Sequence, residues 1–102
     1  MGAADFFTTA RGKTSQEAFS AAVSEARHMF GHEGYTGTIA EKDGFKMVSV
    51  PPGSSSVEHA SELLDNEAHW VQNKWGPAGC IQTAFDEDTG ISTFIFFGYA
   101  SS

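Results

Sequence analysis

The chain has 102 residues, which is enough for one domain with a single core and too few for two. Apolar side chains make up 40% of it, and nine residues are phenylalanine, so the composition excludes an intrinsically disordered protein. The formal net charge is −7, with one basic and seven acidic side chains in residues 52–102. Because such a half repels phosphate backbones, we expect no nucleic-acid binding and a protein partner with a basic surface. The alternative is that the charge serves only to keep the protein in solution.

Cys80 is the only cysteine, so the chain can form no disulfide within itself, and a buried free thiol is expected. The first residues show no charged segment followed by an apolar one, as a secretion signal would have. The longest apolar stretch, residues 95–100, is far short of the ~20 residues that span a bilayer. These features predict a cytoplasmic protein that does not bind membranes.

Residues 5–10 are rich in phenylalanine and threonine and predict an opening strand. A helix follows, because Thr14 and Glu17 form a capping box in which each side chain can bind a free backbone N–H. Apolar residues recur at helical spacing up to Phe30, and Gly31 is a typical stop.

Two short strands are predicted next, over residues 36–41 and 45–50. The Asp-Gly pair at 43–44 lies between them and is a strong signal for a tight turn. Two prolines at 51–52 end the pairing, because proline has no N–H to donate. This segment is therefore expected to form a hairpin.

A second capping box, from Ser55 to Glu58, predicts the start of another helix. Apolar residues then recur every three or four positions, at Val57, Ala60, Leu64, Ala68, Val71 and Trp75. The helix is expected to continue to Trp75, since the glycine and proline that follow are typical of a helix end.

The last segment predicts another hairpin, with strands over residues 80–85 and 91–100. The second strand is apolar on both faces, which indicates that both are covered. One cover would be the two helices, and the other either a loop or a second copy of the protein. A homodimer through Phe94, Phe96 and Tyr99 is therefore one expectation, because an apolar sheet face tends to be buried.

The predicted order of elements is β-α-β-β-α-β-β, within a single α+β domain over residues 1–102. Both helices are expected to pack on one face of a mostly antiparallel sheet. The first six elements match the ferredoxin-like arrangement, with the last strand as a C-terminal extension.

The segment from Gly31 to Gly37 is the main candidate for a binding site, since three glycines within seven residues allow a ligand to approach the backbone closely. His32, Glu33, Tyr35 and Thr36 lie in it, and tyrosine offers a stacking face and a hydroxyl donor. The functional interpretation is a site for a small ligand or nucleotide. The alternative is that this segment only connects a helix to a strand.

No arrangement typical of catalysis or metal binding is found in the sequence. Residues 12–14 lack the first glycine of a phosphate-binding loop, so Lys13 or Lys42 would supply only positive charge to a nucleotide. The four histidines have no ligand spacing, because a glycine breaks the helix between His28 and His32. We therefore predict no catalytic residue, no metal and no cofactor.

A further candidate surface lies on the second helix, where Glu58, Glu62 and Asp65 share one face at spacings of four and three. Such a run is ordinarily a solvated helix face. We expect this face, an open sheet edge or the glycine-rich segment to contact a protein partner.

The stretch Gly34-Tyr35-Thr36-Gly37-Thr38-Ile39-Ala40-Glu41-Lys42 resembles small proteins of unassigned function encoded by bacteriophages, particularly those of actinobacteria. The resemblance extends over roughly residues 6–50 and brings no catalytic residues with it. It implies expression inside a bacterial host, where a compact phage protein often binds and alters a host component. The predicted function is thus a small non-enzymatic accessory protein that binds a host protein. The alternative is a small-ligand or nucleotide-binding protein, and an enzyme is the least supported.

Overall fold

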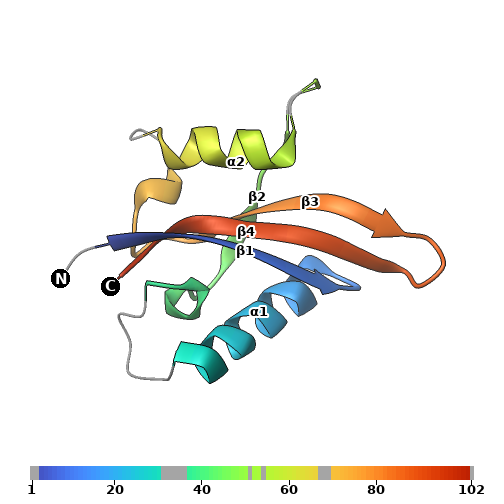
Figure 1. Cartoon of the computed structure of the whole chain (residues 1–102), viewed down its shortest axis with the longest axis horizontal. Coiled ribbons are helices and arrows are strands. Elements are labelled where there is room, and N and C mark those ends of the chain that lie inside the picture. Colours follow the sequence, from blue (N-terminus) through green and yellow to red (C-terminus); the bar gives the residue numbers. More distant parts are fainter. Residues whose placement is uncertain (1–2, 31–36, 51, 54, 67–69, 102) are drawn as a thin grey trace.

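A computed structural model describes residues 3–30, 37–50, 52–53, 55–66 and 70–101, and it confirms the α+β class. The elements in these residues follow the order β1 (Ala3–Gly12), α1 (Ser15–Phe30), η1 (Ile39–Glu41), β2 (Phe45–Met47), α2 (Ser56–Leu64), η2 (Trp70–Gln72), β3 (Ala78–Asp86) and β4 (Ile91–Ser101), where η is a short 3₁₀-helix. The sheet lies between the two α-helices, so these elements form three layers (Figure 1).

The sheet is mixed, and its strands lie in the order β1-β4-β3-β2. β4 lies inside the sheet and pairs antiparallel with both β1 and β3. The predicted C-terminal hairpin is confirmed: Gly90, with a φ of 71°, ends its turn, and the Gly90 N–H donates to the Asp86 carbonyl. β2 pairs parallel with β3. The two edges of the described sheet are therefore β1 and β2.

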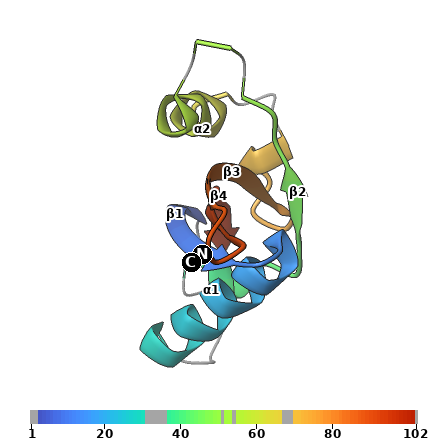
Figure 2. The same ribbon diagram turned by 90° about the vertical axis from the view of Figure 1, so that its right-hand side faces the viewer.

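The two helices cover opposite faces of the sheet, which corrects the expectation that both lie on one face (Figure 2). Phe94 and Phe96 of β4 pack in the core beneath α1, whereas Ile95 and Phe97 pack in the core beneath α2. Successive side chains of a strand point to opposite faces, so β4 contributes to both cores. Because Phe94 and Phe96 are buried within the chain, they are not available for the dimer predicted through the C-terminal strand.

α1 begins where the capping box predicted it. The Thr14 hydroxyl accepts the N–H of Glu17 at 3.1 Å, and the Glu17 carboxylate accepts the N–H of Lys13 at 2.9 Å. The helix continues to Phe30, as its apolar spacing predicted.

α2 begins at the predicted position but is much shorter than predicted. Its cap is Ser55, whose hydroxyl accepts a backbone N–H of the first turn at 3.1 Å. The helix ends at Leu64, so the prediction that it continues to Trp75 is wrong. The side-chain amide of Gln72 donates to the Leu64 carbonyl, and Val71 reaches the core from η2 instead. The apolar spacing of the sequence therefore extends beyond the end of α2, because α2 and η2 pack against the same core.

The segment before β2 contains a 3₁₀ turn where a strand was predicted. Thr38 caps η1 by accepting the N–H of Ala40 at 3.2 Å, and such local hydrogen bonds compete with extended structure. β2 covers only Phe45–Met47 and pairs with β3 through the crossover that contains α2. The described order is thus β-α-β-α-β-β, and the ferredoxin-like arrangement is not the one observed.

Candidate functional site

The four residues predicted to form a ligand site, His32, Glu33, Tyr35 and Thr36, lie outside the described residues. The described chain continues at Gly37, whose φ of 70° is a left-handed value that favours glycine. A ligand site in this segment therefore stays a prediction.

Lys42, considered above as a possible phosphate contact, is buried with only 3% of its surface exposed. Its amino group donates to three backbone carbonyls, those of Asn73 at 3.2 Å, Lys74 at 3.3 Å and Gly76 at 2.9 Å. It also lies 6.0 Å from the centre of the Phe6 ring. Burial lowers the pKa of Lys42 from 10.5 to about 8. The amino group thus ties the end of η1 to the turn before β3 and is not free to bind a phosphate.

The N-terminus of α1, beside Lys13, is the other place where a nucleotide was considered. A phosphate binds a helix N-terminus through free backbone N–H groups. Here the carboxylate of Glu17 already accepts one of these groups, and its negative charge lies where a phosphate would have to bind. The Lys13 N–H is thus engaged by Glu17, and the Lys42 amino group is buried, so these two places do not favour the nucleotide-binding alternative.

Cys80 is a buried thiol, as predicted. Burial raises its pKa to about 12, so the thiol stays protonated and unreactive near neutral pH. His28 is exposed on α1, while His59 lies 4.0 Å from the Glu62 carboxylate on α2. Within the residues that the structure describes, no three His, Cys, Asp or Glu side chains are grouped so that they could hold a metal ion.

The acidic residues predicted as a contact surface lie on the exposed side of α2, and we call Glu58, Glu62 and Asp65 the acidic face. The opposite side of the helix, with Ala60 and Leu64, packs on the sheet. Of the three carboxylates, only that of Glu62 has an ionic partner among the described residues, a histidine at 4.0 Å. The negative charge of the acidic face is therefore mostly uncompensated.

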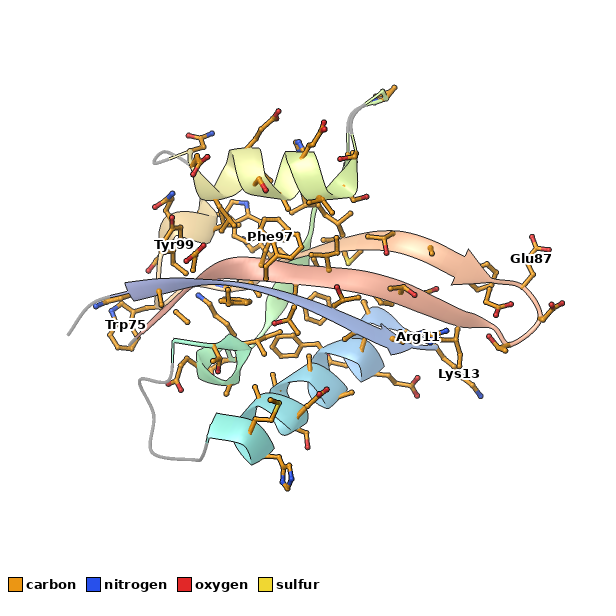
Figure 3. All side chains as sticks on the ribbon, viewed as in Figure 1. Arg11, Lys13, Trp75, Glu87, Phe97 and Tyr99 are labelled. Carbon is orange, nitrogen blue, oxygen red and sulfur yellow. The ribbon has the colours of Figure 1, made fainter. Side chains whose placement is uncertain are left out.

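A second exposed acidic group lies at the end of the β3–β4 hairpin, where Asp86, Glu87 and Asp88 begin the turn. Glu87 points away from the sheet (Figure 3). Phe85, directly before this group, is 58% exposed. β3 is exposed at every residue after Ile81, so this end of the hairpin extends beyond the layer of α2 (Figure 1).

β1 leaves one long edge of the sheet open, since β4 is its only neighbour among the described strands. Asp5, Phe7, Thr9 and Arg11 alternate along the face opposite α1, and all four are exposed. A groove of about 350 Å³ lies beside this edge, between residues 5–9 and the C-terminal half of α1. An open sheet edge was among the expected contact surfaces, but the sequence did not indicate which strand would form it.

None of the described helices is long and apolar enough to cross a bilayer. Comparisons with protein-family models, with curated proteins and with solved structures find no match to this chain. The surfaces of the chain itself are therefore the basis for its proposed function.

Proposed function

We propose that this protein is a non-enzymatic binding protein whose acidic face on α2 engages a basic surface of another protein. The observation that carries the proposal is that Glu58, Glu62 and Asp65 are all exposed. Among the described residues, only Glu62 has an ionic contact, with His59 at 4.0 Å. Uncompensated charges of one sign attract a partner of opposite charge from a distance and help to orient it as it approaches.

Apolar side chains next to these charges support a contact surface. Val57 lies beside Glu58 at the start of α2 and is 54% exposed. The hairpin end has a similar composition, with exposed Phe85 next to three carboxylates. Protein interfaces commonly combine apolar or aromatic anchors with a polar rim. Each of these two exposed regions offers that combination to a basic partner.

The resemblance to phage-encoded proteins suggests what kind of partner this is. In this proposal the protein is expressed inside a bacterial host and acts there as an accessory factor. Its partner is then a host protein, and binding changes what that host protein does.

The test compares two variants that change the net charge equally. Glu58→Gln/Glu62→Gln removes two charges from the acidic face, and Glu25→Gln/Asp43→Asn removes two exposed charges elsewhere. Tagged wild type and both variants are incubated with lysate of an actinobacterial host at low and high salt. We expect the first variant to recover about tenfold less of a stoichiometric, salt-sensitive partner, whereas the control recovers it like wild type.

Two results would contradict the proposal. Equal recovery with both variants would mean that the partner does not use the acidic face. Recovery of no stoichiometric protein by wild type would contradict binding to a host protein altogether. Circular dichroism and thermal unfolding of each variant exclude misfolding as the cause of a loss.

A further inference from the structure

We propose that the open edge of β1 is the interface between two copies of this chain. In this dimer the two β1 strands pair antiparallel and join the two sheets into one, with a twofold axis at Thr8. This surface is separate from the acidic face of α2, so the inference goes beyond the proposed binding function.

The backbone of β1 is suited to strand pairing. β1 has ten residues and lies at the edge of the sheet, where β4 is its only partner among the described strands (Figure 2). A row of its N–H and C=O groups therefore faces away from β4. Proteins commonly block such an edge with proline, lysine, a bulge or a very short strand. β1 contains neither proline nor lysine, and its register with β4 runs without a break from Ala3 to Gly12. A long regular edge of this kind is a template for another strand.

The charges on this edge are complementary to themselves in one register. Asp5 and Arg11 lie on the same face, six residues and therefore about 20 Å apart along the strand, too far to meet within one chain. Neither side chain forms an ion pair with another described residue. When two β1 strands run antiparallel with Thr8 opposite Thr8, Asp5 of each copy lies opposite Arg11 of the other. The twofold symmetry then creates two such ion pairs, one at each end of the interface.

Neighbouring registers lose this match. A shift by two residues in one direction places Asp5 opposite Thr9, and a shift in the other direction places it opposite Lys13, which lies beyond the end of β1. In the proposed register Phe7 lies opposite Thr9 of the partner subunit, and these two side chains cover each other. Phe7 is 42% exposed in the single chain, so this pairing removes apolar surface from water.

On the other face of the sheet, the added strand runs beside the groove between β1 and α1. The proposed register places Ala10 of the partner subunit opposite Phe6, and Thr8 of the partner subunit opposite Thr8, and both Phe6 and Thr8 line the groove. The side chains of the added strand that lie nearest the groove are therefore small. Met29, which lines the groove and is 67% exposed, would be partly covered by the added strand.

Charge reversal tests both the interface and its register. Wild type, Asp5→Arg, Arg11→Asp and the double variant Asp5→Arg/Arg11→Asp are compared by analytical ultracentrifugation. We expect wild type to dimerise and each single variant to dimerise about tenfold or more weakly, because like charges then face each other at both ends. The double variant restores both opposite-charge pairs and should dimerise like wild type. A mixture of the two single variants should form a heterodimer, since all of its facing pairs are again of opposite charge.

Hydrogen exchange of wild type provides a measurement that needs no variant. Outward-facing amides of β1 should exchange more slowly at a concentration where the dimer dominates than at one where it has dissociated. The proposal is overturned by a wild type that stays monomeric at millimolar concentration, or by a double variant and a mixture that both fail to restore the dimer. Protection of β1 amides only when a different protein is bound would assign the edge to that protein and would also overturn it.

Discussion

The two faces of the sheet are covered to different extents. On one face, the sixteen residues of α1 cover a core with five described phenylalanine rings, and neighbouring ring centres among Phe19, Phe45, Phe94 and Phe96 lie 5.1 to 6.3 Å apart. On the other face, the nine residues of α2 cover β3 and β4 but leave Phe7 of β1 partly exposed. The difference indicates that the α1 face contributes more to the stability of the fold, whereas the α2 face leaves apolar surface exposed at β1, where we propose the dimer contact.

The largest expected effect is the loss of an aromatic ring from the α1 face. Phe96 is fully buried, and its ring centre lies 5.5 Å from those of Phe19 and Phe45. We expect Phe96→Ala to lower the free energy of unfolding by about 4 kcal/mol, and Leu64→Ala on the α2 face by about 2 kcal/mol. Urea unfolding followed by circular dichroism measures both. Equal losses would contradict the view that the α1 face contributes more to stability.

A second test adds one methyl group beneath the α2 face. A Cβ on Gly79 would lie 2.5 Å from Cζ of Phe97, whose ring is fully buried, so the ring or the strand would have to shift. We expect Gly79→Ala to lower the free energy of unfolding by about 2 kcal/mol. Gly44→Ala is the matched control, because a Cβ there meets no atom within 4 Å, and its effect should stay within about 0.5 kcal/mol. If the two variants were equally stable, the α2 face would be loosely packed around Phe97.

A third test concerns Lys42, which ties η1 to the turn before β3. The folded protein releases the Lys42 proton near pH 8, whereas the unfolded chain holds it to 10.5, so stability rises with pH between these values. Cys80 acts in the opposite sense: its pKa rises from 9.0 to about 12 on folding, so it lowers stability above pH 9. We expect the free energy of unfolding to rise by about 1 kcal/mol from pH 7 to 9 and then to level off.

Two variants separate these opposing contributions. Chemical unfolding is measured at steps of half a pH unit from pH 7 to 10. The free energy of unfolding of Lys42→Met should not rise over this range. For Cys80→Ala the rise should instead continue beyond pH 9. If Lys42→Met kept the rise of wild type, another group would be its cause.

The smallest expected effects are at the helix caps. Among the described residues, side chains of Thr14 and Glu17 each accept a backbone N–H at the start of α1, whereas only the Ser55 side chain does so at the start of α2. We expect Thr14→Ala to lower the free energy of unfolding by about 1 kcal/mol and Ser55→Ala by about half as much. Thermal and urea unfolding measure the two losses. A larger loss for Ser55→Ala would mean that α2 contributes more to the stability of the fold than its length indicates.

Local signals in the sequence correctly predicted α1 and the C-terminal hairpin. The capping box at Thr14 and the apolar spacing up to Phe30 are complete within one segment, and no distant contact changes them. The apolar character of the last strand on both faces likewise predicted that both are covered, and side chains of β4 do pack in both cores. The exposure of Glu58, Glu62 and Asp65 also follows from helical spacing alone, so this part of the candidate site could be predicted.

Other features depend on residues far apart in the chain. α2 ends at Leu64 because Gln72 folds back onto it and Val71 reaches the same core from another element. The sequence around Lys42 is typical of a tight turn, and nothing local indicates that three carbonyls some thirty residues away surround its amino group. The open edge formed by β1 depends on which strands pair, and pairing is not encoded in β1 itself.

The sequence alone therefore determined the α+β class, the starts of both helices, the hairpin and the acidic face, because each depends on neighbours in the chain or on composition. Only the tertiary structure decided that the helices lie on opposite faces, that β2 runs parallel to β3 and that Lys42 is buried. The physical reason is that apolar periodicity identifies which side of a helix or strand must be buried, but it does not identify the element that packs against that side.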